Sequence, residues 1–171
     1  MPSAALFGIS AALGFVLWGI ITWQFIWPAL SKRPRADALR PILLLHGFRF
    51  VGLAFVIPGV ASAQLPAAFA QSAAYGDLAA SILALLAIAA LGSRLEPALI
   101  WAFNLVGTAD LLYAFYQGNR VSLALAPGLL GATYFLPTVL VPLLLITHVV
   151  VFRLMLRTNI AVPSRTQQRA A

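Results

Sequence analysis

Five long apolar stretches, separated by short polar or basic segments, constrain the fold of this chain more than any other feature. A membrane-spanning helix needs about 20 mostly apolar residues. The five stretches cover approximately residues 4–30, 41–61, 77–92, 97–116 and 134–155. Of all residues, 62% are hydrophobic and 9% are charged, whereas a soluble domain has roughly 45–50% and about 25%. We therefore predict an all-α integral membrane protein, a single five-helix bundle over residues 1–157 with a flexible cytoplasmic tail at 158–171.

Proline and acidic residues suggest where the predicted helices begin. Pro41 suits the first turn of the second helix, where its missing N–H has no helical partner to lose. Asp77 suits the N-terminus of the third helix, because a carboxylate there can cap free backbone amides. The polar residues 62–76 before it are read as an interfacial loop. Residues 123–130 are apolar but only about half as long as a membrane span, which predicts an interfacial or partly re-entrant element.

The positions of the basic residues predict the orientation of the chain. Cytoplasmic loops carry an excess of lysine and arginine. If the connection after the first helix is cytoplasmic, that side holds Lys32, Arg33, Arg35, Arg40, Arg94, Arg153, Arg157, Arg165 and Arg169. Only Arg120 then lies outside. We therefore expect an outside N-terminus and a cytoplasmic C-terminus. The alanine- and arginine-rich composition indicates a GC-rich bacterium, hence a multi-pass protein of the cell inner membrane with a periplasmic N-terminus.

Arg49 and Asp110 are the ionisable residues placed deepest in predicted spans. Each costs about 2.5–3.5 kcal/mol to insert into a membrane, so each needs a partner or a purpose. Arg49 lies about 12 Å from the cytoplasmic end of the second span, and Asp110 lies about 9 Å below the outer surface. We expect an Arg49–Asp110 pair that pins two helices together. A sharper alternative is that Arg49 awaits an anionic head group or substrate.

The chain has two histidines, and the predicted helices place both at the same depth. His46 lies on the same helical face as Arg49, three residues before it. His46 and His148 both fall about 7 Å inside the cytoplasmic boundary. Equal depth is what a bis-histidine haem b site requires. The competing interpretation is that both histidines are hydrogen-bonded packing residues. A metal site formed by the histidines and Asp110 is disfavoured by the difference in depth.

The fourth predicted span adds further polar residues at helical spacing. Trp101, Asn104 and Thr108 follow one another on this span, with Gly107 beside them. They extend the candidate ligand-binding or polar network, which comprises His46, Arg49, Trp101, Asn104, Thr108, Asp110 and His148. The default interpretation is interhelical adhesion, in which each polar contact contributes about 0.6 kcal/mol and glycine permits close approach.

The motifs that the chain lacks narrow its function. It has no cysteine, no phosphate-binding glycine loop, no dinucleotide fingerprint and no zinc-protease motif. The four acidic residues look scattered, so no paired-carboxylate arrangement is predicted, and an enzyme of familiar type is not expected. The net charge of +7 follows from membrane anchoring, so the expected partners are the lipid bilayer and a membrane complex or homo-oligomer, not nucleic acid.

Three functions remain open from the sequence. The first is a binding or accessory membrane protein whose bundle holds a small lipid-like or quinone-like ligand. The second is a b-type haem electron-transfer protein that uses His46 and His148. The third is a proton-coupled transporter in which Asp110 and Arg49 exchange partners.

Overall fold

The computed structural model of the protein describes residues 1–157, and this part of the chain is helical with no β-strand. Five helical stretches are long and apolar enough to cross a membrane: Ser3–Ser31, Arg35–Val56, Ala67–Ala89, Glu96–Arg120 and Leu136–Leu156. The prediction of an all-helical chain with five such stretches is confirmed. The tail predicted at 158–171 lies outside the described residues.

Three of the five stretches change helix type along their length. The α-helices are α1 (Ser3–Ile21), α2 (Trp27–Ser31), α3 (Arg35–Gly47), α4 (Ala67–Ala89), α5 (Glu96–Arg120) and α6 (Val141–Leu156). Two π-helical turns, η1 (Thr22–Ile26) and η5 (Leu136–Leu140), join α1 to α2 and lead into α6. The 3₁₀ segments are η2 (Phe48–Val56), η3 (Leu123–Leu125) and η4 (Pro127–Tyr134).

The helix α4 differs most from the sequence prediction. It begins at Ala67, directly after Pro66, so residues 67–76 are helical and not part of a loop. Asp77 consequently lies about three turns inside the helix, and its predicted role as an N-terminal cap is wrong. Alanine is the best helix former, and five alanines between residues 67 and 76 support the longer helix. In the second stretch, α3 begins at Arg35, which moves Pro41 from the first turn to the second.

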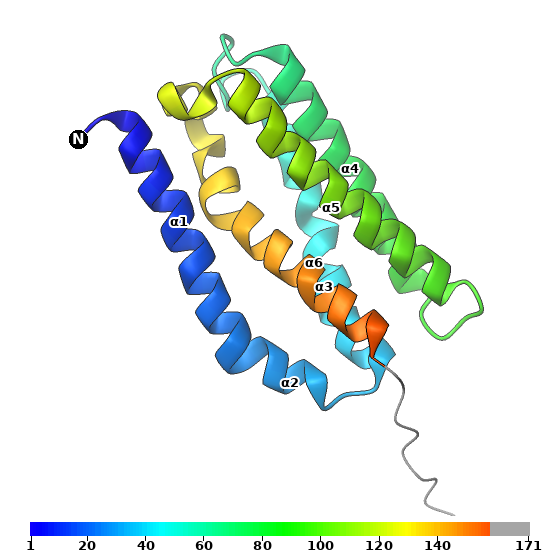
Figure 1. Cartoon of the computed structure of the whole chain (residues 1–171). Helices are drawn as coiled ribbons and strands as arrows, with labels where there is room; N and C mark the ends of the chain where they lie inside the picture. Colours follow the sequence, from blue (N-terminus) through cyan, green and yellow to red (C-terminus); the bar gives the residue numbers. More distant parts are fainter. Residues whose placement is uncertain (158–171) are drawn as a thin grey trace, which may run out of the picture.

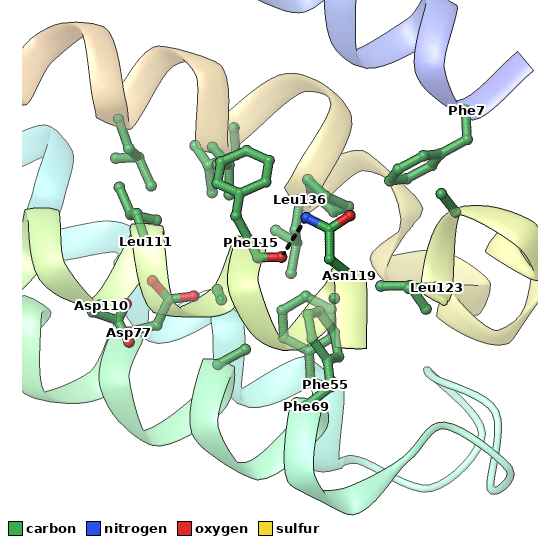
Figure 2. Close-up of a pocket in the computed structure, with 18 residues that line it drawn as sticks. Phe7, Phe55, Phe69, Asp77, Asp110, Leu111, Phe115, Asn119, Leu123 and Leu136 are labelled. Carbon is green, nitrogen blue, oxygen red and sulfur yellow. Dashed lines mark hydrogen bonds between the residues drawn. The ribbon is translucent and has the colours of Figure 1, made fainter. Parts of the chain in front are cut away.

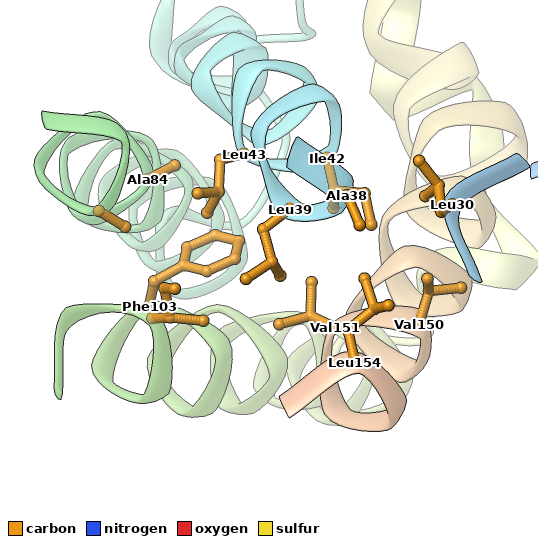
Figure 3. Packing of buried hydrophobic residues seen from close by; sticks show 12 residues of the cluster. Leu30, Ala38, Leu39, Ile42, Leu43, Ala84, Phe103, Val150, Val151 and Leu154 are labelled. Atoms are coloured by element: carbon orange, nitrogen blue, oxygen red, sulfur yellow. The ribbon is translucent and has the colours of Figure 1, made fainter. Parts of the chain in front are cut away.

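The bundle has two apolar clusters, one towards each end. The first surrounds Phe103 of α5 near the end that carries the α4–α5 turn, and it draws on α2, α3, α4, α5 and α6 (Figure 3). The second surrounds Phe55 and Phe69, whose rings meet edge to face at a centroid distance of 5.4 Å. Between the two clusters, the helices bring buried polar side chains together.

The helix α1 lies on the outside of the bundle, alongside α6 and η5 (Figure 1). None of its residues is buried. At Gly14 it lies so close to η5 that a Cβ would collide with the carbonyl oxygen of Thr138. Pro142, four residues later, has no N–H with which to make an α-helical hydrogen bond to that carbonyl. Trp18 donates its indole N–H to the neighbouring Val139 carbonyl at 3.1 Å.

The connections at the end opposite the α4–α5 turn are tied to one another. The amides of Ser62 and Ala132 donate to the carbonyls of Leu129 and Val60 at 3.0 and 2.9 Å. Gly131 has a positive φ of 54° and approaches the Val60 backbone so closely that a Cβ would not fit. The segment predicted as interfacial or re-entrant, residues 123–130, is therefore a pair of 3₁₀ turns whose Leu123 and Leu130 are buried in the second cluster.

Candidate functional site

The backbone carrying Arg49 tightens from an α-helix into a 3₁₀-helix one residue earlier, at Phe48. The 3₁₀ segment η2 is nine residues long, whereas runs beyond three or four are uncommon and often mark functional or strained positions. On α4, the Ser81 hydroxyl donates to the Gly47 carbonyl at 2.6 Å, so a neighbouring helix supports the change of helix type. The transition sets the direction in which Arg49 leaves the backbone.

Arg49 is the centre of a buried polar group that we call the Arg49 cluster, together with Asp77, Gly107, Asp110 and His148. Its side chain is 0% exposed. Its Nε donates to Asp77 Oδ1 at 2.7 Å, and its Nη2 donates to Asp110 Oδ2 at 2.5 Å. Its Nη1 donates to the Gly107 carbonyl at 3.1 Å. The predicted Arg49–Asp110 ion pair is therefore present, and it joins η2 to α5.

Asp77 is the member of the Arg49 cluster that the sequence prediction missed. From its position in α4 it shares the guanidinium of Arg49 with Asp110. The statement that no two carboxylates are paired is therefore wrong. One sequence signal pointed to the error, because the predicted span 77–92 has 16 residues, fewer than the roughly 20 that a crossing needs. Extending that helix towards its N-terminus moves Asp77 into the bundle.

The two histidines lie side by side, with ring centroids 4.3 Å apart. Asn104 Oδ1 is 2.7 Å from His148 Nδ1, and Arg49 Nη1 is 3.3 Å from His148 Nε2. Because the guanidinium can only donate, His148 Nε2 accepts and its Nδ1 carries the proton. The Thr147 hydroxyl donates to carbonyls of its own helix, so it accepts from His46 Nε2 at 2.9 Å.

This arrangement of the histidines does not fit a haem iron held between them. Three of the four ring nitrogens already have hydrogen-bond partners, namely Nε2 of His46 and both nitrogens of His148. The Phe103 ring packs against both imidazoles, with centroid distances of 5.0 and 5.2 Å, so this space is already filled. Among the described residues there is also no group of three side chains suited to a metal ion. The geometry supports the competing interpretation, packing histidines joined by hydrogen bonds.

Three glycines make room for the charged side chains. A Cβ on Gly107 would lie 2.7 and 2.8 Å from ring atoms of His148 and 2.9 Å from Arg49 Nη1. A Cβ on Gly52 would collide with Asp77, and one on Gly76 would collide with Asp110. Each glycine sits on a helix that faces the charged residue across the interface. The close packing of α4 against η2 and α5 therefore depends on these positions.

Two residues of the predicted polar network lie apart from the Arg49 cluster. The Thr108 hydroxyl donates to the Asn104 carbonyl of its own helix at 2.6 Å. Trp101 packs against Phe152, with ring centroids 5.7 Å apart. The other five residues of the predicted polar network do come together: His46, Arg49, Asn104, Asp110 and His148. The structure adds Asp77 and Thr147 to this network, which the sequence did not suggest.

A half-open pocket begins at the Arg49 cluster and extends towards the second apolar cluster. Its volume is about 110 Å³, comparable to an engineered cavity of about 150 Å³ that binds benzene. Asp77 and Asp110 lie together at one end of it (Figure 2). The walls are apolar and come from α1, η2, α4, α5, η3, η5 and α6; they include Phe7, Phe55, Phe69, Leu111, Phe115, Leu123 and Leu136.

The pocket meets the carboxylates and not the guanidinium. The side chains of Asp77 and Asp110 are 14% and 11% exposed, compared with 0% for Arg49, and Arg49 does not line the pocket. The geometry does not favour the alternative that Arg49 awaits an anionic head group, because two carboxylates bind the guanidinium and separate it from the open space.

Comparison with known protein families finds a match over nearly the whole described chain. The family model described as "Domain of unknown function (DUF8737)" matches residues 6–156. The chain belongs to this family. The match begins in α1 and ends at the last residue of α6, so it includes all five long helices and every residue of the Arg49 cluster. No curated protein and no solved structure matches the chain.

Proposed function

We propose that this DUF8737 protein is a multi-pass protein of the bacterial inner membrane that binds a small amphiphilic, lipid-like molecule within its helix bundle. The observation that carries the proposal is the half-open apolar pocket that has Asp77 and Asp110 at its inner end. Ligand pockets are usually concave and mostly apolar, with a few polar groups that fix the ligand's orientation. The apolar part of the ligand would contact the phenylalanines, and its polar end would reach the two aspartates.

The distribution of charge supports a membrane location with an outside N-terminus. Seven basic residues lie at the end of the bundle that carries the α4–α5 turn: Lys32, Arg33, Arg35, Arg40, Arg94, Arg153 and Arg157. Arg120 lies at the opposite end, where α5 terminates. At the basic end, the guanidinium groups of Arg153 and Arg157 lie 5.5 and 5.6 Å from the Trp27 ring, as expected for an interfacial tryptophan beside cytoplasmic cations.

The second aspartate is the main argument for a binding role beyond helix adhesion. One carboxylate is enough to neutralise a buried arginine, and each additional ionisable group in a membrane span costs about 2.5–3.5 kcal/mol on insertion scales. Asp77 and Asp110 both contact Arg49 and both line the pocket. A role in helix adhesion alone explains neither the second aspartate nor the open space beside it.

Mass spectrometry of the intact protein, extracted from its own membrane in mild detergent, tests this function. We expect one bound small molecule per chain in the wild type. Ala114 lines the pocket, and in Ala114→Trp the indole fills the space, so the bound molecule should be lost. Leu112→Trp is the matched control, because Leu112 lies on the same helix and is 57% exposed. An adduct equally present in both variants, or absent from the wild type, would contradict the proposal.

Proton-coupled transport is a second candidate, and the shared arginine favours it. Arg49 holds two carboxylates at once, so loss of one contact leaves the other in place, as an exchange of partners requires. Proton flux into vesicles that contain the purified protein provides the test. Flux that is present in the wild type and absent in Asp110→Asn would favour transport. A proton flux into wild-type vesicles no greater than that into protein-free vesicles would exclude transport.

A further inference from the structure

We propose that the polar group recognised in the pocket is a protonated primary amine, so that the ligand is an amphiphilic amine. This inference rests on the proposed function and specifies the chemical class of its ligand. It follows from the side of the Arg49 cluster that faces the pocket and from the balance of charge in that cluster.

Each aspartate has one oxygen that is not used by Arg49. Asp77 binds the guanidinium through Oδ1 and Asp110 binds it through Oδ2. Among the described residues, no hydrogen bond is donated to Asp77 Oδ2 or Asp110 Oδ1. Neither atom belongs to the fully buried atoms without a partner, which are Thr22 Oγ1, Arg35 Nε, His46 Nδ1 and Asn104 Nδ2. Both oxygens therefore keep some exposed surface, although Asp77 Oδ2 packs against Gly52 and Asp110 Oδ1 packs against Gly76. Both aspartates line the inner end of the pocket (Figure 2).

The charges within the Arg49 cluster do not balance when both carboxylates are ionised. Asp77 and Asp110 then carry two negative charges against the single positive charge of Arg49. The residues that line the pocket include no lysine, arginine or histidine. A cation at the inner end would restore neutrality, and an ammonium group has three N–H donors that the carboxylates can accept.

Other polar head groups match this end of the pocket less well. A carboxylate or phosphate would face two anions with the guanidinium behind them. A quinone presents carbonyl oxygens, which accept hydrogen bonds and have no proton to donate to an ionised carboxylate. A hydroxyl can donate, but it carries no charge, so it leaves the excess negative charge of the cluster in place and lacks the attraction between opposite charges. The amine is therefore the preferred group.

Binding of three ligands with the same alkyl chain tests the preference. Decylamine, decanol and decanoate are each titrated into the detergent-purified full chain, and the bound ligand is counted by mass spectrometry of the intact protein. We expect one decylamine per chain with a dissociation constant at least about tenfold lower than that of decanol, because the ammonium adds the attraction between opposite charges to the hydrogen bond that either group can donate. Decanoate should bind most weakly.

Substitution of the aspartates shows whether the preference for decylamine arises at the pocket. Asp110→Asn should lower the affinity for decylamine about tenfold and that for decanol much less, since only the amine loses the attraction between opposite charges. Asp77→Asn should have the same effect, and it provides an independent variant if one of the two folds poorly. Asp37→Asn is the control, because Asp37 is exposed in the first turn of α3. Equal losses in Asp37→Asn would contradict an effect at the pocket.

The outcomes separate the two proposals. Equal affinity for decylamine and decanol, unchanged by either substitution, would overturn the amine inference and leave the pocket as a site for neutral amphiphiles. Binding of decanoate in preference to both would overturn it more strongly. Failure of all three ligands to bind, in a protein that also lacks a co-purified molecule, would overturn the proposed function itself.

Discussion

At the scale of single residues, the energetics of the bundle centre on Arg49. A buried ion pair adds little net stability compared with apolar packing, but removal of one partner leaves an uncompensated charge. Arg49 uses all three of its nitrogens in contacts with Asp77, Gly107 and Asp110. Its loss therefore exposes two carboxylates to an apolar interior at once. Arg49 is therefore the counter-ion that allows both aspartates to lie in the interior of the bundle.

Replacement of this arginine should be severely destabilising. In Arg49→Leu, the two aspartates lose their counter-ion, and we expect the free energy of unfolding to fall by about 3–5 kcal/mol. Denaturant unfolding in detergent micelles measures the change. Arg120→Leu is the control, because Arg120 is exposed at the end of α5. An Arg49→Leu protein as stable as the wild type would contradict the central role of the pair.

Gly107 provides a test of the packing beside Arg49. In Gly107→Ala, the added methyl group would press on His148 and Arg49 at 2.7–2.9 Å, and overpacking of this kind typically costs about 1–3 kcal/mol. Gly8→Ala is the matched control, since a Cβ at Gly8 meets nothing within 4 Å. Thermal unfolding should show a loss of stability in Gly107→Ala and no such loss in Gly8→Ala. Equal stability would indicate that α5 is not held as closely as described.

At the scale of elements, departures from the regular α-helix coincide with the important contacts. The 3₁₀ segment η2 carries Arg49, and the π-helical turn η5 contains Thr138, whose carbonyl α1 approaches through Gly14. Such irregular turns are often found at functional positions. Since α1 contributes no buried residue, its place beside the pocket depends on this contact, on the Trp18 hydrogen bond and on the contacts of Phe7 and Ser10 with Tyr134.

The docking of α1 can be tested by cross-linking. The Tyr134 hydroxyl donates to Ser10 Oγ at 3.0 Å, and the chain has no native cysteine. We expect a short bismaleimide to join Ser10→Cys and Tyr134→Cys within one chain, with the product detected by mass spectrometry of its peptides. Adding Gly14→Leu should sharply reduce the yield, because no side chain fits against Thr138. Adding Gly8→Leu, which points to open space, should not.

The sequence predicts which helices exist better than it predicts where they begin and end. The residues of the site are predicted less well than the helices. Hydropathy found all five long helices, and counting residues inwards from the ends paired Arg49 with Asp110. The sequence does not place Asp77 in the site, because the polar residues of 62–76, among them Gln71 and Ser72, predict a loop there. Helical backbone accommodates both, since the Ser72 hydroxyl donates to the Ala68 carbonyl at 2.7 Å and Gln71 is exposed near the helix end. The changes of helix type depend on tertiary contacts such as that of Ser81, which periodicity does not reveal.

At the scale of the whole molecule, polar groups and charges are arranged in layers. Two apolar clusters occupy the two halves of the bundle, the Arg49 cluster lies between them, and basic residues gather at one end. The pocket runs from the central polar layer into the second apolar cluster. A molecule bound there would place its polar group at mid-bundle and its apolar part near η3 and Phe7.

The proposed orientation predicts which loops reach the outside of the cell. Arg94→Cys lies in the α4–α5 turn, and Gln64→Cys lies in the opposite connection before α4; both positions are exposed. A membrane-impermeant maleimide applied to intact cells with a permeabilised outer membrane should label Gln64→Cys and not Arg94→Cys. Both should react after detergent lysis, which controls for reactivity. The reverse pattern would indicate an inside N-terminus, against the distribution of positive charge.

The most direct test of the central claim is a high-resolution experimental structure of the protein purified from its own membrane without added ligand. The account predicts five membrane-spanning helices and density for a non-protein molecule in the pocket, with its polar end in contact with Asp77 and Asp110 and its apolar part against Phe55, Phe69 and Phe115. A pocket closed by its own side chains, or a guanidinium of Arg49 turned away from both aspartates, would contradict the account.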